Sequence, residues 1–303
     1  MSDTFTSNRW TINLGSCIWG IPIKAHATFL ALLLIQLIVG AFQQNILWLL
    51  YLFLMFGPIL TITILVHEYG HAITTKLLGG QVDGIVLWPL GGFALCGPTD
   101  SGPCGDLKVA VAGPLAHIPQ MIIWVGVYAS VMAGDLTGFL KEDTWTSVTS
   151  GGSTGFFSAI CASSFYFNAY LMVFNLFVPA YPLDGGRCLA CILILCGVEV
   201  EKAALLTAIS AIILGVLFGI IGLAMVFFYG QTSGLFMLLI VAFILESSIR
   251  LYKLVKEGRV LEHPLFGREC YQNQGSNGDS AVLRSTPISA PGKVRAPHGI
   301  DSV

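Results

Sequence analysis

Two histidines four residues apart, with a glutamate directly after the first, form the most informative motif in this chain. His67, Glu68 and His71 belong to the sequence His-Glu-Tyr-Gly-His. On a helix the two histidines lie one turn apart on the same face, so both imidazoles can bind one Zn²⁺ ion while Glu68 takes a proton from water beside it. The motif therefore predicts metal-assisted hydrolysis. The competing interpretation is a chance match in a soluble helix, with both histidines on the surface.

The residues before the motif favour the metal-binding interpretation. Residues 46–66 are so apolar that a lipid bilayer is their expected surrounding. Ionisable side chains are costly in hydrocarbon, and those found at that depth are paired and functional by default. We therefore expect His67, Glu68 and His71 to be buried around one zinc ion per chain.

The composition predicts an all-α polytopic membrane protein. Hydrophobic residues make up 55% of the 303 residues, charged residues only 11%, and the mean hydropathy is +0.78. A membrane-spanning helix needs about 20 mostly apolar residues. Gly57 and Pro58 are expected to kink one such helix. Six candidate helices lie at 25–42, 47–78, 108–133, 156–178, 203–229 and 232–250.

The placement of positive charge predicts the orientation. With both termini in the cytoplasm, the outside loops contain only Lys141 of the 15 lysines and arginines. Because lysine and arginine concentrate on the cytoplasmic side, we expect a multi-pass protein with both termini in the cytoplasm, in a membrane that the sequence does not name. The net charge of −2 indicates no basic surface for nucleic acid.

The spans and the charge distribution predict three regions in the chain. Residues 1–24 form a cytoplasmic N-terminal segment, residues 25–250 a six-helix membrane domain, and residues 251–303 a cytoplasmic tail. From about residue 270 the tail turns to Gly, Ser, Asn and Pro, which bury too little apolar area to fold. We expect that part to be disordered.

A third zinc ligand is needed, because a catalytic zinc site has three protein ligands and one open position. The best candidate is Asp184, which follows the fourth apolar segment. Pro179 and Pro182 interrupt the helix before it, and two glycines follow it. Such an unwound stretch at membrane depth is tolerated where it lines a water-filled cavity or is buried in protein. The competing interpretation is that Asp184 only caps the helix that follows it and runs to residue 195.

With both motifs in view, the chain resembles the site-2 protease family of intramembrane zinc metalloproteases, peptidase family M50, over residues 20–250. In that family HExxH lies on the second core helix and an NxxPxxPLDGG segment lies at the fourth. Here residues 179–186 match the PxxPLDGG part of that segment, and Asn175 lies one residue further from Pro179 than the pattern places it. Weaker matches are Gly-Ile-Pro-Ile at 20–23 with His26, Pro-Leu-Gly-Gly-Phe at 89–93, and Ala-Gly-Pro-Leu at 112–115. The expected form is compact, without a PDZ or CBS domain.

The resemblance implies roles for these residues. His67, His71 and Asp184 would be the zinc ligands and Glu68 the catalytic base. The implied activity is hydrolysis of a peptide bond within or near a transmembrane segment of a membrane protein, which in this family usually releases a tethered regulator. Asn175 matches a position near the substrate, where its amide could stabilise the oxyanion. It could equally fix the fourth helix to a neighbour.

Residues 82–95 predict a short interfacial β-hairpin between the second and third membrane helices. They contain β-branched and aromatic residues broken by Gly and Pro. An exposed strand edge at Gly91, Gly92 and Phe93 could bind an unwound substrate by strand addition. The competing interpretation is a hairpin that only packs over the site.

His117 is a departure from the family, in which many members carry Asn at that position. It is either a hydrogen-bonded core histidine or a group that lines the cavity. A different class of function also stays open. A membrane transporter or metal-binding scaffold could use the same histidines for an ion, although its usual inverted repeats are not evident in this sequence.

Overall fold

The computed structural model describes residues 11–16, 18–88, 91–97, 99, 101–141, 143–229 and 233–267. Three predictions lie outside the described residues: the disordered tail from about residue 270, the first part of the N-terminal segment, and residues 89 and 90 of the hairpin.

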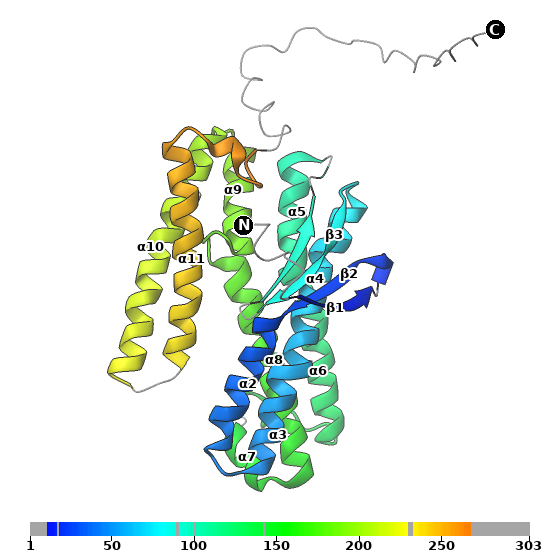
Figure 1. Cartoon of the computed structure of the whole chain (residues 1–303). Helices are drawn as coiled ribbons and strands as arrows, with labels where there is room; N and C mark the ends of the chain where they lie inside the picture. The colour runs from blue at the N-terminus through cyan, green and yellow to red at the C-terminus, as the bar shows by residue number, and fades with distance from the viewer. Residues whose placement is uncertain are drawn as a thin grey trace, which may run out of the picture.

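Helices make up most of the described chain (Figure 1). The longer helices and helical segments are α2 (Ala27–Ala41), α3 (Ile46–Leu54), the π-helical turn η2 (Met55–Ile59), α4 (Leu60–Leu77), α5 (Gly102–Leu115), α6 (His117–Val131), α7 (Thr144–Ser150), α8 (Gly152–Phe177), α9 (Asp184–Leu195), α10 (Val200–Phe227) and α11 (Ser233–Lys256). Short 3-10 turns are η1 (Ile18–Gly20), η3 (Phe139–Lys141) and η4 (Val260–Glu262). The strands are β1 (Thr11–Ser16), β2 (Pro22–His26), β3 (Val82–Trp88) and β4 (Gly91–Cys96).

Within the described residues, five helical segments are long and apolar enough to cross a membrane. They are Ile46–Leu77, Gly102–Val131, Gly152–Phe177, Val200–Phe227 and Gly234–Lys256. These segments match five of the six predicted spans. The first predicted span corresponds to α2, whose 15 residues are fewer than the about 20 that a full span needs.

The segment that leads to His67 passes through η2, which contains Pro58. Proline has no backbone N–H to donate and disturbs the regular helical ladder. The chain responds with a wider π-helical turn instead of ending the helix, and the hydroxyl of Thr61 donates to the Gly57 carbonyl at 2.6 Å. The kink predicted at Gly57 and Pro58 therefore takes the form of a π-helical turn.

The third predicted span, 108–133, begins earlier and consists of two helices. It starts at Gly102, and α5 ends at Leu115 just before α6 begins at His117. Pro119 explains the interruption, because a residue without an N–H fits the first turn of a new helix and not the interior of a continuous one. His117 is thereby placed at the start of α6.

The predicted hairpin of β3 and β4 is present and belongs to a larger sheet. The sheet has the order β1-β2-β3-β4, with β2 and β3 parallel and the other pairs antiparallel. Alternate residues of β2 are buried, and Ile23, Ile85 and Leu87 pack against Tyr69 and Ala72 of α4. The sheet is therefore anchored to the helix that carries the His-Glu-Tyr-Gly-His motif, with β4 at its edge (Figure 1).

The last two long helices, α10 and α11, form an antiparallel pair, with α9 between this pair and α5 (Figure 1). After α11 the chain folds back, and Val260, Leu265 and Phe266 join a core with residues of α9 and α10. This packing holds α9, and with it Asp184, in place.

Two glycines allow α4 and α5 to approach closely. A Cβ atom added to Gly70 would lie 2.6 Å from the Ala112 carbonyl oxygen and 3.0 Å from the Gly113 Cα. Both are backbone atoms of α5, so neither can move without moving the helix. The α4 and α5 axes are therefore held at a separation that only glycine permits.

We expect Gly70→Ala to destabilise the fold by about 1–3 kcal/mol, because the added methyl group overpacks a contact between two backbones. The change is measured as a lower apparent Tm in detergent. Gly219→Ala in α10 is the matched control, since its Cβ would meet the Val241 side chain at an ordinary 3.5 Å. Equal melting temperatures for Gly70→Ala and the wild type would show that α4 and α5 are not closely packed.

Candidate metal centre

The two motif histidines lie on the buried face of α4. His67 is 7% exposed and His71 is 4% exposed, and their Nε2 atoms are 3.1 Å apart. This separation follows from the i, i+4 spacing on a helix, which stacks side chains of one face above each other. The predicted convergence of the two imidazoles is present in the structure.

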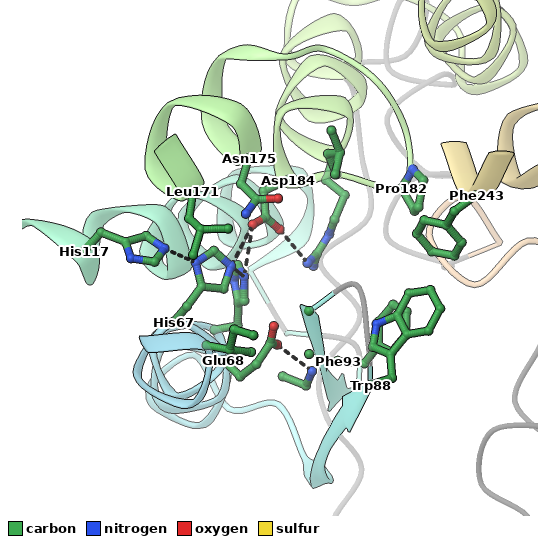
Figure 2. Close-up of a pocket in the computed structure, with 17 residues that line it drawn as sticks. His67, Glu68, Trp88, Phe93, His117, Leu171, Asn175, Pro182, Asp184 and Phe243 are labelled. Carbon is green, nitrogen blue, oxygen red and sulfur yellow. Dashed lines mark hydrogen bonds and ion pairs between the residues drawn. The ribbon is translucent and has the colours of Figure 1, made fainter. Parts of the chain in front are cut away.

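Asp184 meets both histidines from the opposite side. Its Oδ2 atom lies 3.1 Å from His67 Nε2 and 3.2 Å from His71 Nε2. It is the first residue of α9 and is 7% exposed. The predicted third ligand atom therefore completes a buried triangle with the two imidazoles, as Figure 2 shows for His67 and Asp184.

The unwound stretch before Asp184 is held by hydroxyl groups of neighbouring helices. The Ser210 hydroxyl of α10 donates to the Pro179 carbonyl at 2.8 Å, and the Ser248 hydroxyl of α11 donates to the Tyr181 carbonyl at 2.9 Å. These bonds satisfy carbonyl groups that a regular helix would have satisfied itself. They also fix the path of the chain into α9.

The two glycines after Asp184 allow this stretch to turn tightly. A Cβ atom on Gly185 would lie 2.8 Å from the Leu176 carbonyl oxygen, and one on Gly186 would lie 2.7 Å from the Tyr181 Cα. These backbone atoms leave no space for a side chain. The Leu-Asp-Gly-Gly sequence is therefore required for Asp184 to reach the histidines.

The donor set fits a zinc ion. His71 Nδ1 lies 2.7 Å from the Val109 carbonyl oxygen, which can only accept, so Nδ1 carries the hydrogen and Nε2 presents a lone pair. A Cβ atom on Gly113 would lie 2.8 Å from His67 Nε2, so glycine keeps the space beside the ligand atoms free. Two imidazole nitrogens and a carboxylate oxygen form one of the usual catalytic zinc sets.

Glu68 lies on the same cavity but bonds to the sheet. It is 5% exposed, and its Oε2 atom accepts a hydrogen bond from the Ala94 backbone N–H of β4 at 2.7 Å. Figure 2 shows the carboxylate directed toward the strand that carries Phe93. The carboxylate is thus positioned beside the ligand triangle without belonging to it.

A cavity of about 150 Å³ opens beside these groups. The other predicted site residues, Asn175, Gly91, Gly92 and Phe93, all line it. Trp88 stacks on Phe93 at 5.1 Å between ring centroids and meets Phe243 of α11 edge to face at 4.7 Å. The ligand triangle therefore lies on one side of the cavity and an aromatic wall on the other (Figure 2).

Sequence reasoning missed several residues at this site. Arg187 lines the cavity and places its Nη1 atom 3.5 Å from Asp184 Oδ1, which leaves Oδ2 for the histidines. Its position three residues after Asp184 on α9, one turn away, could have indicated this. Asn168, which is fully buried in the middle of α8, contacts His117 at 2.8 Å. An amide side chain in the middle of a predicted membrane span was the available signal.

Comparisons with known proteins agree with this geometry. The sequence pattern of peptidase family M50 matches residues 55–217, more than half of the chain. The zinc metalloprotease MJ0392 of Methanocaldococcus jannaschii is 28% identical over 176 residues, which cover 58% of this chain and 44% of that protein. Rip3 of Mycobacterium tuberculosis is 29% identical over 126 residues, which cover 41% of this chain and 27% of Rip3. The matched region thus spans less than half the length of either relative.

A solved structure shares the fold. The site-2 protease from Methanocaldococcus jannaschii superposes with a TM-score of 0.52 at 25% identity, covering 80% of this chain and 95% of that structure. The five apolar helices and these likenesses identify a multi-pass membrane protein. The chain belongs to peptidase family M50 and has the fold of a site-2 protease.

Proposed function

We propose that the protein is an intramembrane zinc metalloendopeptidase that hydrolyses a peptide bond within or near a transmembrane segment of a membrane protein, and so releases a tethered regulator. The observation that carries this proposal is the buried triangle of His67, His71 and Asp184 on apolar helices, with Glu68 beside it. A buried carboxylate and two buried imidazoles without a shared cation would be an expensive arrangement in hydrocarbon.

The residues divide the chemistry between them. His67, His71 and Asp184 would hold one zinc ion, which acts as a Lewis acid on the scissile carbonyl and acidifies water. Glu68 would accept the proton of the attacking water and pass it to the leaving amine. Because these side chains are buried, their charges interact more strongly there than in water.

Asn175 would supply an amide N–H to the oxyanion that forms on the substrate carbonyl. Its place on the cavity wall beside Asp184 supports this role (Figure 2). A residue that only fixed α8 to a neighbour would not need to line the cavity.

The edge strand β4 would bind the unwound substrate through Gly91, Gly92 and Phe93. Ala94 faces Ile85 across the hairpin, yet its N–H points to Glu68 and away from β3. Peptide groups alternate in direction along a strand, so the groups of Gly92 also point to the site. A substrate strand paired there would lie against Glu68 and the ligand triangle.

The charge distribution supports a topology with both termini in the cytoplasm. In that orientation His67 lies near the inner end of the span that begins at Ile46, so the zinc site would lie in the cytoplasmic half of the bilayer. Fragments cut there would enter the cytoplasm. The lipid bilayer and a membrane-protein substrate are the partners that this arrangement requires.

Glu68→Gln should lower the cleavage rate of a reporter membrane segment by about 10²-fold or more, because the amide cannot accept the proton from water. Zinc content measured on the purified protein should stay at one per chain, since Glu68 is outside the ligand triangle. A transporter or metal-binding scaffold would be indifferent to this change. Full cleavage by the purified variant would therefore reject Glu68 as the base, and no cleavage by the wild type would reject the proposed activity.

Gly113→Ala should remove zinc, because the new methyl group would occupy space beside both Nε2 atoms. We expect bound zinc to fall at least about 10-fold, as measured by elemental analysis after dialysis. Gly126→Ala on α6 is the matched control, since a Cβ atom there meets nothing within 4 Å. Normal zinc content in both variants would place the ion elsewhere.

Asn175→Ala should lower kcat by about 10²-fold if its amide stabilises the oxyanion. Protein yield and zinc content are measured alongside and should be unchanged. A loss of protein level with normal turnover per molecule would instead assign Asn175 to helix packing.

A further inference from the structure

His117 is buried beside the metal centre but is not one of its three ligands. It opens α6, is 1% exposed, and places its Nε2 atom 3.0 Å from His67 Nδ1. Its other nitrogen, Nδ1, lies 2.8 Å from Asn168 Oδ1 on α8. Both ring nitrogens are therefore within hydrogen-bond distance of a buried partner, as Figure 2 shows for the contact with His67.

Which atom donates in each of these hydrogen bonds follows from a further bond, between Asn168 and Ser164. The Asn168 Nδ2 group donates to the Ser164 carbonyl at 2.9 Å, and a carbonyl can only accept. The amide oxygen of Asn168 must therefore face His117, and His117 Nδ1 must carry the hydrogen. In a neutral imidazole the second nitrogen is then an acceptor, so His117 Nε2 accepts from His67 Nδ1–H.

The consequence reaches the ligand triangle. When His67 carries its hydrogen on Nδ1, its Nε2 atom has a lone pair directed at Asp184 and His71. If His67 carried its hydrogen on Nε2 instead, His117 Nε2 would have to donate, and His117 Nδ1 would become an acceptor. Two acceptors, His117 Nδ1 and Asn168 Oδ1, would then face each other 2.8 Å apart in a buried site.

The two ligand histidines thus both carry their hydrogen on Nδ1, but different hydrogen-bond partners hold it there. His71 donates directly to the Val109 carbonyl of α5. His67 donates through the His117 ring and the Asn168 amide to the Ser164 carbonyl of α8. Each route ends at a backbone carbonyl, which cannot reverse its role.

We propose that His117 and Asn168 are positioning residues that hold His67 in the tautomer and orientation that bind the metal. The proposal rests on the metal centre of the proposed function and deepens it. Partners of this kind fix ring orientation, and their loss typically lowers metal affinity 10- to 100-fold. His117 and Asn168 would act through His67. His117 also lines the cavity, but both of its ring nitrogens are taken up by His67 and Asn168.

The test compares zinc affinity among variants of the full-length protein in detergent, by competition with a chelator. His117→Leu removes the acceptor and should weaken zinc binding by about 10- to 100-fold. His117→Gln places an amide oxygen near the position of Nε2 and should recover most of this loss. Asn168→Leu frees His117 to adopt either tautomer and should give an intermediate loss.

The matched control is Gln120→Leu, one turn further along α6. Gln120 is also buried, but its side-chain amide donates to the carbonyl of Ala116, the residue that precedes α6. This variant loses a polar group of α6 without disturbing His67, and it should bind zinc like the wild type. Absorption spectra of the Co²⁺-loaded proteins provide a second readout, because they report ligand geometry. They should change in His117→Leu and revert in His117→Gln.

Three outcomes separate the inference from the proposed function. If the wild type binds one zinc ion and His117→Leu binds it equally tightly with the same cobalt spectrum, the positioning role is wrong and the metal centre stands. If His117→Gln loses as much affinity as His117→Leu, His117 acts only by packing. If the wild type takes up no zinc, the metal centre itself is wrong, and the positioning role with it.

A measurement of the tautomer in the wild type covers the case in which the His117 and Asn168 variants do not fold. Nitrogen-15 NMR of the zinc-free protein, with the His67 signals assigned by their absence in His67→Asn, reports which ring nitrogen is protonated. We expect a hydrogen on His67 Nδ1. A His67 ring protonated only on Nε2 would overturn the inference.

Discussion

A polar group among apolar helices must find a partner inside the protein, and this constraint explains most of the site. The ring nitrogens that face away from the ligand triangle have hydrogen-bond partners inside the protein. His71 bonds directly to the Val109 carbonyl, and the bonds that start at His67 end at the Ser164 carbonyl. The broken stretch before α9 follows the same rule, with serine hydroxyls in place of helical N–H groups. The remaining polar atoms of His67, His71 and Asp184 point toward one another and present lone pairs that could bind a cation.

Close backbone contacts are the second requirement, because three segments must meet within hydrogen-bond distances. Gly70 and Gly113 let α4 and α5 approach until the histidines lie beside α5, and Gly185 and Gly186 let the chain return sharply enough to bring in Asp184. Larger residues at these positions would separate the backbones that carry the ligands. Glycine is therefore used here for proximity, whereas the polar side chains determine direction.

Local sequence was sufficient for the parts of the molecule that depend on periodicity or spacing. The apolar spans, the hairpin and the pairing of His67 with His71 are of this kind. The structure contains the hairpin, the histidine pair and five of the six predicted spans, with the shorter α2 in place of the first. Asp184 could be inferred because two prolines and two glycines mark a broken helix. The parallel pairing of β2 with β3 and the contact of His117 with Asn168 could not, because the partners are far apart in sequence. The three-region division and the cytoplasmic termini stay predictions.

The ligand atoms come from α4 and α9, two segments separated by the whole of α5 to α8. A cation shared between them would join distant parts of the chain at one point inside the bilayer. Its binding free energy then adds to the association of those helices, since an ion that binds only the folded form stabilises that form. Loading with the ion would therefore stabilise the packing of these distant segments, and removal of the ion by a chelator would lower the stability of the whole fold.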